Sequence, residues 1–378
     1  MNSQIKNDQV NIDNPKPSNL RWGRRGTAGV SFASTISFDK VDVILGGKKI
    51  LNQLDLTLLR GEIVCLLGES GSGKSTILRI IAGIQQINSG TVSINKTVVS
   101  DANYNLEPQK RGVGLMFQDF ALFPHLTLLE NVAFGLSSLK NTEKYRQANA
   151  ALLRVGLSGR ENDYPHMLSG GQQQRLALAR TIAPRPGVIM LDEPFSGLDS
   201  KMREAVRAET LAVLRETNAT TIIVTHDPEE AMLLGDKIIL LRNGQVIQND
   251  SSINVYHHPI DIEVARFLSP ISEITGMVKN GQVETPLGAI KTPKKADGQK
   301  VIIVIRPVDA IEMYDKKPGT RGRLISKREA LGVDIYEVQV EHMEQLISVR
   351  QRSDPNFLVG SDVFLRINMQ HVLVFDQE

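Results

Sequence analysis

The chain has 378 residues, 41% of them hydrophobic and 23% charged, with a formal net charge of +2. This composition is typical of a soluble globular protein long enough for two domains, and a dedicated nucleic-acid binder would usually be more basic. The sequence has no apolar run near the roughly 18 residues of a membrane helix, and its N-terminus lacks the apolar core of a signal peptide. The single cysteine, Cys65, excludes an internal disulfide, and we expect it to be a buried structural thiol in a reducing cytoplasm.

The first part of the chain differs in composition from the rest. Residues 1–34 are polar and rich in Asn, Ser, Pro and Gly, with Arg21, Arg24 and Arg25 clustered near Trp22. Such a stretch has too little apolar surface to form a core, so we predict a disordered tail. A membrane-surface arm, a regulatory arm and an overlong start-site assignment are open alternatives.

From Ser37 onward the pattern predicts a strand-rich core. Short β-like runs are expected at 37–45, 54–59, 92–94, 98–99 and 112–118. From Asp119 to Leu168 the apolar spacing changes to the helical period of about 3.6, as in 128–139 and 143–155. We therefore expect a helical insert at about 119–168.

The most informative stretch is GESGSGKST, at 68–76. It fits the phosphate-binding P-loop pattern G-x-x-x-x-G-K-[ST], between the apolar run 63–67 and the helical run 76–82. Its glycines let the backbone approach a polyphosphate, so that N–H groups and a helix N-terminus face negative charge. Lys74 is expected to reach the β- and γ-phosphates, and the Ser75 hydroxyl to hold Mg²⁺.

Two later strands end in polar side chains. The apolar run 188–191 is followed by Asp192 and Glu193, and the predicted strand 221–225 by His226. A carboxylate at the carboxyl edge of a strand beside the P-loop strand is where Mg²⁺ is held in such proteins. We therefore predict a metal site and a catalytic site at this edge.

A further segment, LSGGQQQR at 168–175, places glycines before a helical run and predicts a second anion-binding helix N-terminus. Together these segments resemble the nucleotide-binding subunit of ATP-binding-cassette (ABC) transporters over about 36–268. A single P-loop is common among proteins, but the LSGGQ segment combined with Glu193 directly after Asp192 is found almost exclusively in this family. The motifs occur in family order: GESGSGKST, Gln118, LSGGQQQR, IMLDEP, Ser196-Gly197-Leu198-Asp199 and Thr225-His226.

The resemblance implies roles for single residues. Glu193 would polarise the attacking water as general base, and His226 would contact the γ-phosphate. Gln118 would touch the metal and the water, and Asp192 would position Mg²⁺ together with Ser75. The implied nucleotide-binding residues of the P-loop are Gly68, Glu69, Ser70, Gly71, Ser72, Gly73, Lys74, Ser75 and Thr76.

The resemblance also implies that two copies of the chain pair head to tail. The residues Ser169, Gly170, Gly171 and Gln172 of one copy would cap the ATP on the P-loop of the other. Asp199 resembles the residue that crosses this contact. Each site would then be complete only when closed, which links hydrolysis to domain motion.

One position departs from the family pattern. Where most members have an aromatic residue that stacks on adenine, this chain has Leu45. Apolar contact with the base remains, but ring stacking worth about 1 kcal/mol is lost. We therefore predict weaker and less base-selective nucleotide binding.

The last third of the chain has a different pattern. Short alternating runs, separated by Gly, Pro and Asp turns, indicate an all-β domain. They lie at 275–278, 289–292, 301–305, 322–327, 335–340, 346–350, 362–367 and 372–375. This part resembles the oligomer-binding-fold regulatory (TOBE) domain of importer ATPases, and Ile305-Arg306-Pro307 resembles its recurring Arg-Pro step. Ligand sensing and buttressing of a homodimer are equally open roles for it.

The predicted fold class is α/β: a P-loop ATPase domain at 35–268 with a helical subdomain, then a TOBE-like β domain at 269–378. The resemblance implies ATP hydrolysis, with ATP and Mg²⁺ as cofactors, coupled to solute import from the cytoplasmic face of a bacterial inner membrane. Integral-membrane permease subunits and a periplasmic solute-binding protein are the expected partners, and no nucleic acid is expected. The C-terminal segments TPLGAIKT, IRPVDA and REALGVDIYEV look most like those of ferric-iron importer ATPases, while polyamine, sulfate, phosphonate and sugar importers remain open.

Two rival functions come from other classes. Soluble ABC ATPases acting on DNA or ribosomes tend to have tandem cassettes, a long coiled coil or paired CxxC hooks, whereas this chain has one P-loop and one cysteine. A purely regulatory nucleotide binder is disfavoured because Glu193 and His226 are both present.

Overall fold

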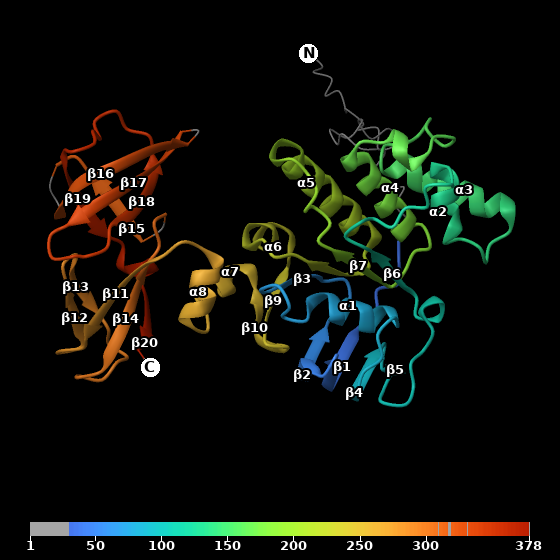
Figure 1. Cartoon of the computed structure of the whole chain (residues 1–378), viewed down its shortest axis with the longest axis horizontal. Coiled ribbons are helices and arrows are strands. Elements are labelled where there is room, and N and C mark those ends of the chain that lie inside the picture. Colours follow the sequence, from blue (N-terminus) through green and yellow to red (C-terminus); the bar gives the residue numbers. More distant parts are fainter. Residues whose placement is uncertain (1–29, 309, 317–318, 331, 378) are drawn as a thin grey trace, which may run out of the picture. The chain divides into compact units, whose positions relative to one another are not determined.

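The computed structural model describes residues 30–377 apart from 309, 317, 318 and 331 (Figure 1). The chain divides into two compact units, the first ending at Ser252 and the second beginning at Ile253. Residues 253–268, which the predicted boundary places in the ATPase domain, group with the second unit. Within the described parts of the chain, no helix combines the length and apolarity needed to cross a membrane.

A six-stranded sheet forms the centre of the first unit, with strand order β10-β9-β3-β8-β7-β6. Its strands are β3 (Ile63–Leu67), β6 (Val113–Met116), β7 (Val188–Asp192), β8 (Thr220–Val224), β9 (Lys237–Arg242) and β10 (Gln245–Ser251). All neighbours are parallel except β10, which runs antiparallel to β9. β3 and β8 are buried along their whole length, as their continuous apolar runs require.

This strand order corrects one expectation. The strand that ends in Asp192 was expected beside the P-loop strand, but β8 lies between β3 and β7. Because all three strands are parallel, their carboxyl ends still meet at one edge of the sheet. The predicted site residues therefore remain close together.

The P-loop connects β3 to helix α1 (Lys74–Ala82), which ends at Gly83 as predicted. At Gly68 an added Cβ would lie 2.4 Å from the carbonyl oxygen of Leu241, and φ is +157°. At Gly73 it would lie 2.6 Å from the Cδ2 of Leu51, and φ is +107°. Side chains cannot be accommodated at these two positions, which is the physical reason for the glycines of the pattern.

A second, antiparallel sheet has the order β2-β1-β4-β5. Its strands are β1 (Ile36–Leu45), β2 (Lys48–Leu58), β4 (Ser89–Ile94) and β5 (Thr97–Ser100). β2 begins earlier than the predicted run 54–59, because it continues directly from β1 through the turn at Gly46 and Gly47. Side chains of this sheet, α1 and the central sheet share one hydrophobic core.

The helical region has a core of its own. It contains α2 (Leu128–Phe134), α3 (Asn141–Arg154) and α4 (Gly170–Ile182), with the short 3₁₀ helix η2 (Pro165–Met167) before α4. Another 3₁₀ helix, η1 (Pro108–Lys110), lies between β5 and β6. Two further helices, α5 (Ser200–Thr217) and α6 (Pro228–Leu234), connect β7 to β8 and β8 to β9. The predicted range 119–168 contains α2 and α3, and the helical region continues beyond it into α4.

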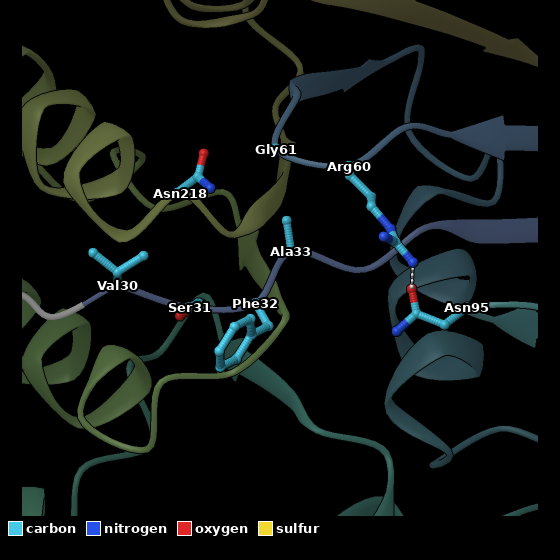
Figure 2. Close-up of a pocket in the computed structure, with 8 residues that line it drawn as sticks. All are labelled: Val30, Ser31, Phe32, Ala33, Arg60, Gly61, Asn95 and Asn218. Atoms are coloured by element: carbon cyan, nitrogen blue, oxygen red, sulfur yellow. Dashed lines mark hydrogen bonds between the residues drawn. The ribbon is translucent and has the colours of Figure 1, made fainter.

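Residues 1–29 of the predicted tail lie outside the described residues, whereas 30–34 are packed against the first unit (Figure 2). The Ser31 amide donates to the carbonyl of Thr217 at 2.7 Å, and the Ser34 amide to that of Gly187 at 3.1 Å. Phe32 is 97% exposed at the rim of a hollow of about 600 Å³. Ordered packing therefore begins within the stretch predicted to be disordered.

The second unit begins with α7 (Ser252–His257) and α8 (Ile262–Leu268) and continues as a β domain. Its sheets have the orders β11-β14-β20, β12-β13 and β15-β19-β16-β17-β18 around one core. The strands are β11 (Ser272–Met277), β12 (Gln282–Thr285), β13 (Gly288–Lys291), β14 (Lys300–Ile305), β15 (Ile311–Tyr314), β16 (Thr320–Ala330), β17 (Val333–Val340), β18 (Ile347–Arg352), β19 (Asp362–Ile367) and β20 (Leu373–Asp376), with a 3₁₀ helix η3 (Met369–His371) before β20. The expected all-β domain is confirmed. Two of its strands, β12 and β15, were not predicted. Each is four residues long, with one buried residue in β12 and two in β15, which gives too short an alternation.

Candidate active site

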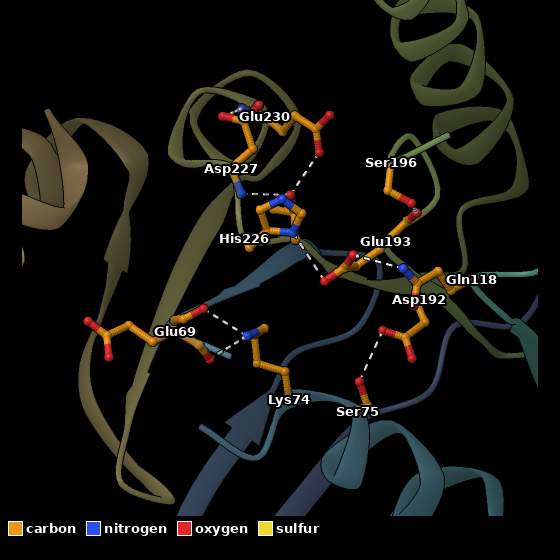
Figure 3. Close-up of polar contacts among 12 residues, drawn as sticks. Glu69, Lys74, Ser75, Gln118, Asp192, Glu193, Ser196, His226, Asp227 and Glu230 are labelled. Atoms are coloured by element: carbon orange, nitrogen blue, oxygen red, sulfur yellow. Dashed lines mark hydrogen bonds and ion pairs between the residues drawn. The ribbon is translucent and has the colours of Figure 1, made fainter. Parts of the chain in front are cut away.

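The predicted catalytic residues meet at the carboxyl edge of the central sheet (Figure 3). Asp192 is the last residue of β7, Glu193 follows it directly, and His226 lies two residues after the end of β8. Gln118 follows β6 and faces the same edge. Residues far apart in the sequence are thus brought together as the family pattern implies.

Lys74 lies at the start of α1 and is 7% exposed. Its ammonium donates hydrogen bonds to the carbonyl oxygens of Gly68 at 2.7 Å and Glu69 at 2.8 Å (Figure 3). Burial lowers the pKa of Lys74, although the charges of Glu193 and Asp192 act in the opposite direction. Two of the three ammonium protons are thus bonded to carbonyls of the P-loop itself, and one donor remains for a phosphate.

Ser75, Asp192 and Gln118 are the residues predicted to contact the metal; the first two are hydrogen-bonded to each other, whereas Gln118 is bonded to Glu193. The Ser75 hydroxyl donates to Oδ1 of Asp192 at 3.3 Å. Burial raises the pKa of Asp192, and the Ser75 hydrogen bond partly opposes this shift. A hydroxyl and one carboxylate fit Mg²⁺, which takes few protein ligands and completes its shell with phosphate oxygens and water. The described residues contain no group of three or more His, Cys, Asp or Glu that could hold a metal ion.

Glu193 is held from two sides. Gln118 Nε2 donates to its Oε2 at 3.2 Å, and His226 Nδ1 lies 3.1 Å from its Oε1. The backbone of Glu193 is left-handed, with φ +45°, and its amide donates to the carbonyl of Val224 at 3.0 Å. A non-glycine residue in this conformation stores strain, which often marks a functional position. The turn directs the carboxylate toward the P-loop side of the site.

A pocket of about 450 Å³ lies beside these residues. It is lined by Leu45, Ile50, Ser70, Gly71, Gly73, Lys74, Ser75, Thr76, Glu193 and His226. No Phe, Tyr or Trp is among the described residues that line it. Sequence reasoning missed Ile50. Leu45 pairs with Lys48 across the hairpin, and residues two apart on a strand share a face, so alternation along β2 places Ile50 on the same face as Leu45.

The sequence pattern of the ABC transporter family matches residues 51–196. The Fe(3+) ions import ATP-binding protein FbpC 2 of Pectobacterium atrosepticum is 33% identical, over 88% of this chain and 97% of its own length. This chain belongs to the ABC transporter family. Within it, the chain groups with the ATP-binding subunits of import systems, and binds nucleotide.

Other family members extend the comparison. The Fe(3+) ions import ATP-binding protein FbpC of Streptomyces avermitilis is 35% identical over 86% of this chain and 94% of its own length. The spermidine/putrescine import ATP-binding protein PotA of Mannheimia succiniciproducens is 36% identical over 81% and 86%. A dimeric bacterial ABC transporter cassette superposes with a TM-score of 0.51 at 33% identity, over 57% of this chain and 98% of that one. The same cassette bound to ADP and Pi gives a TM-score of 0.51 at 32% identity, over the same shares.

Residues 169–172, the predicted cap on the ATP of a second copy, are called the signature here, and they lie outside the pocket of their own chain. Ser169 and Gly170 are exposed at the start of α4, and Oε1 of Gln172 accepts from the Ser169 amide and from Arg160 Nη1, each at 3.1 Å. Asp199 Oδ1 accepts from the Met202 amide at 3.0 Å at the start of α5. None of residues 169–172 lines the pocket, and neither does Asp199. A single copy therefore presents the signature outward instead of to its own P-loop.

Arg180 ties the signature helix to the Gln118 loop, a link that sequence reasoning missed. Its guanidinium donates to the carbonyl of Phe120 at 2.6 Å and to that of Ala121 at 2.7 Å. Both residues have left-handed backbones, with φ +61° and +44°. Burial lowers the pKa of Arg180. One arginine on a helix is normally read as a solvated side chain, so only the fold reveals that it stabilises this strained turn.

We expect Arg180→Ala to lower the kcat of ATP hydrolysis about tenfold, because two hydrogen bonds from a charged group hold the loop that carries Gln118. The KM for ATP should change little, since Arg180 does not line the pocket. Steady-state kinetics check both values. Arg146→Ala, in an exposed ion pair with Glu143 on α3, is the matched control and should behave as wild type.

Leu45→Tyr is expected to tighten ATP binding about fivefold, because a ring would restore roughly 1 kcal/mol of stacking. Ile44→Tyr is the control: Ile44 precedes Leu45 on β1, does not line the pocket, and faces the other side of the strand. Calorimetric titration with ATP and GTP measures affinity and base selectivity. An affinity unchanged by Leu45→Tyr, or tightened equally by both variants, would show that this position does not contact the base.

Proposed function

We propose that this chain hydrolyses ATP at the site formed by the P-loop, Asp192, Glu193 and His226, and that hydrolysis drives import of ferric iron. The proposal that this site hydrolyses ATP is supported by the position of Glu193, which lines the P-loop pocket and contacts both Gln118 and His226. A positioned carboxylate with a neighbouring hydrogen-bond network is what a general base for water attack requires.

In the proposed reaction the P-loop amides and the Lys74 ammonium bind the β- and γ-phosphates. Mg²⁺, when bound by Ser75 and Asp192, would neutralise charge that develops on the phosphates. Glu193 accepts a proton from the attacking water, and Gln118 keeps the carboxylate oriented toward that water. His226 then has a free ring nitrogen for the γ-phosphate while its Nδ1 contacts Glu193.

Two copies of the chain are proposed to enclose two ATP molecules, with the exposed Ser169 and Gly170 of each copy on the nucleotide of the other. The outward placement of these residues supports this arrangement. The dimer would act on the cytoplasmic face of the inner membrane. Membrane permease subunits supply the pathway, and we further propose a periplasmic solute-binding protein that delivers the cargo.

Ferric iron is the favoured cargo because the Fe(3+) importer subunits of Pectobacterium atrosepticum and Streptomyces avermitilis match this chain over nearly their whole length. That match includes the β domain as well as the ATPase domain. Polyamine import is the second candidate, since the spermidine/putrescine subunit has a comparable identity. The proposed site residues would contact ATP and not the cargo, so only a transport measurement can distinguish ferric iron from polyamine as the cargo.

Uptake by cells lacking the gene tests the cargo. We expect complementation with the wild-type chain to restore uptake of labelled ferric iron, and complementation with Glu193→Gln to fail. Labelled spermidine and sulfate are the comparison solutes. Restored uptake of either of these, without iron, would overturn the cargo but leave the ATPase mechanism standing.

A further inference from the structure

A pocket of about 330 Å³ lies within the second unit, away from the ATPase residues in the sequence. Its polar lining consists of Tyr256, Ser269, Arg306, Arg328, Ser348 and Arg350. Three of these are arginines, and none of the described residues that line the pocket is acidic. The proposed function does not use this pocket.

The register of the five-stranded sheet places two of the arginines in one row. Arg328 of β16 pairs with Ile335 of β17, and Ile335 pairs with Arg350 of β18. Side chains of directly paired residues point to the same face of a sheet, so the two guanidiniums flank Ile335. Pairing also places Ser348 opposite Glu337 in the next row of the same face.

The two arginines differ in their partners. Arg328 forms an ion pair with Glu337 at 3.0 Å. The side chain of Arg350 forms no hydrogen bond or ion pair within the described part of the chain, although its amide donates to the Pro307 carbonyl at 2.8 Å. Positive charge therefore exceeds negative charge on this wall, and a bound anion would offset the repulsion between neighbouring guanidiniums.

Arg306, the third arginine that lines the pocket, is 3% exposed and fixed in place. Its Nε donates to the Ser269 hydroxyl at 3.0 Å, its Nη1 donates to the Tyr256 carbonyl at 2.7 Å, and its guanidinium carbon lies 3.8 Å from the centre of the Tyr256 ring. A buried, pre-oriented guanidinium is well suited to bind a carboxylate or phosphate group, because little side-chain entropy remains to be lost.

We propose that this pocket binds a small organic anion with two or more carboxylate or phosphate groups. The arginines would contact the charged groups. The remaining lining residues, Pro270, Pro307, Val308 and Ile335, give the hydrocarbon part of such a ligand an apolar surface that an inorganic ion could not use.

Isothermal titration of the full chain with citrate, in Mg²⁺-free buffer at low salt, tests the proposal. We expect saturable binding to the wild type and at least about tenfold weaker binding to Arg350→Ala, since a charge-assisted contact is lost. Arg350 is exposed, so this variant should fold. Inorganic phosphate should bind more weakly than citrate.

Two controls assign the binding to this pocket. Arg352→Ala removes the same charge from the same strand at a residue that does not line the pocket, and should leave citrate affinity within about threefold. Lys74→Met removes the P-loop lysine and should leave it unchanged. No binding at millimolar citrate, equal weakening by Arg350→Ala and Arg352→Ala, or loss of binding in Lys74→Met would each overturn the proposal.

Discussion

Glu193→Gln is expected to lower steady-state ATP hydrolysis by a factor of about 10² to 10⁴, the usual contribution of a positioned general base. The amide keeps the shape of the side chain and can still accept hydrogen bonds through its oxygen, but it cannot take a proton from water. The contact with His226 Nδ1 at 3.1 Å can therefore persist. ATP affinity should stay close to wild type, because binding depends on the P-loop.

Phosphate release and calorimetric titration separate these two effects. The matched control is Glu229→Gln, which makes the same change at a residue whose amide is bonded to the nearby Asp227 but whose side chain does not line the pocket. This control should keep wild-type turnover. If Glu193→Gln also turned over ATP at the wild-type rate, another group would have to activate the water, and the catalytic assignment would be wrong.

Lys74→Met is expected to weaken ATP binding by about a hundredfold or more, because charge-assisted hydrogen bonds to two phosphates are lost together. The apo protein should not unfold at a much lower temperature. Burial already lowers the pKa of Lys74, so the charged form is disfavoured there, and an apolar chain of similar length removes that cost.

Titration with ATP and a thermal unfolding scan without nucleotide measure the two predictions for Lys74. Lys49→Met, which removes a lysine from an ion pair with Asp42 on the neighbouring hairpin, is the control. Wild-type ATP affinity in Lys74→Met would contradict the proposed contact with the phosphates. Weak binding together with a large drop in unfolding temperature would instead assign Lys74 a mainly structural role.

The parts of the site that depend only on residues close together in the sequence could be predicted. The P-loop glycines, the buried strand before them and the helix after them are encoded within 63–83, and the structure has them there. Cys65 is fully buried in that strand, and burial raises the pKa of its thiol, as expected for a structural cysteine. Local pattern also sufficed for most strands of the β domain.

What the sequence did not predict depends on contacts between distant segments. Strand order is one example, because nothing in the run 221–225 says that it lies between β3 and β7. The link from Arg180 to the Phe120 carbonyl and the row formed by Arg328 and Arg350 are others. Judged from the sequence alone, each of these arginines could equally be an exposed side chain in water. Its role can be recognised only when the fold shows which residues lie next to it.

We propose that ATP is held between the P-loop of one copy and the signature turn, residues 169–172, of another, and cross-linking of the two segments tests this arrangement. Cys65 is buried, so Ser70→Cys and Ser169→Cys, both at exposed positions, would each carry one reactive thiol. The two variants, each also carrying Glu193→Gln to retain ATP, are mixed and treated with a short bis-thiol linker. We predict a covalent dimer only when both variants and Mg²⁺–ATP are present. ATP binding by both variants without any such cross-link would show that the two segments do not meet across a dimer.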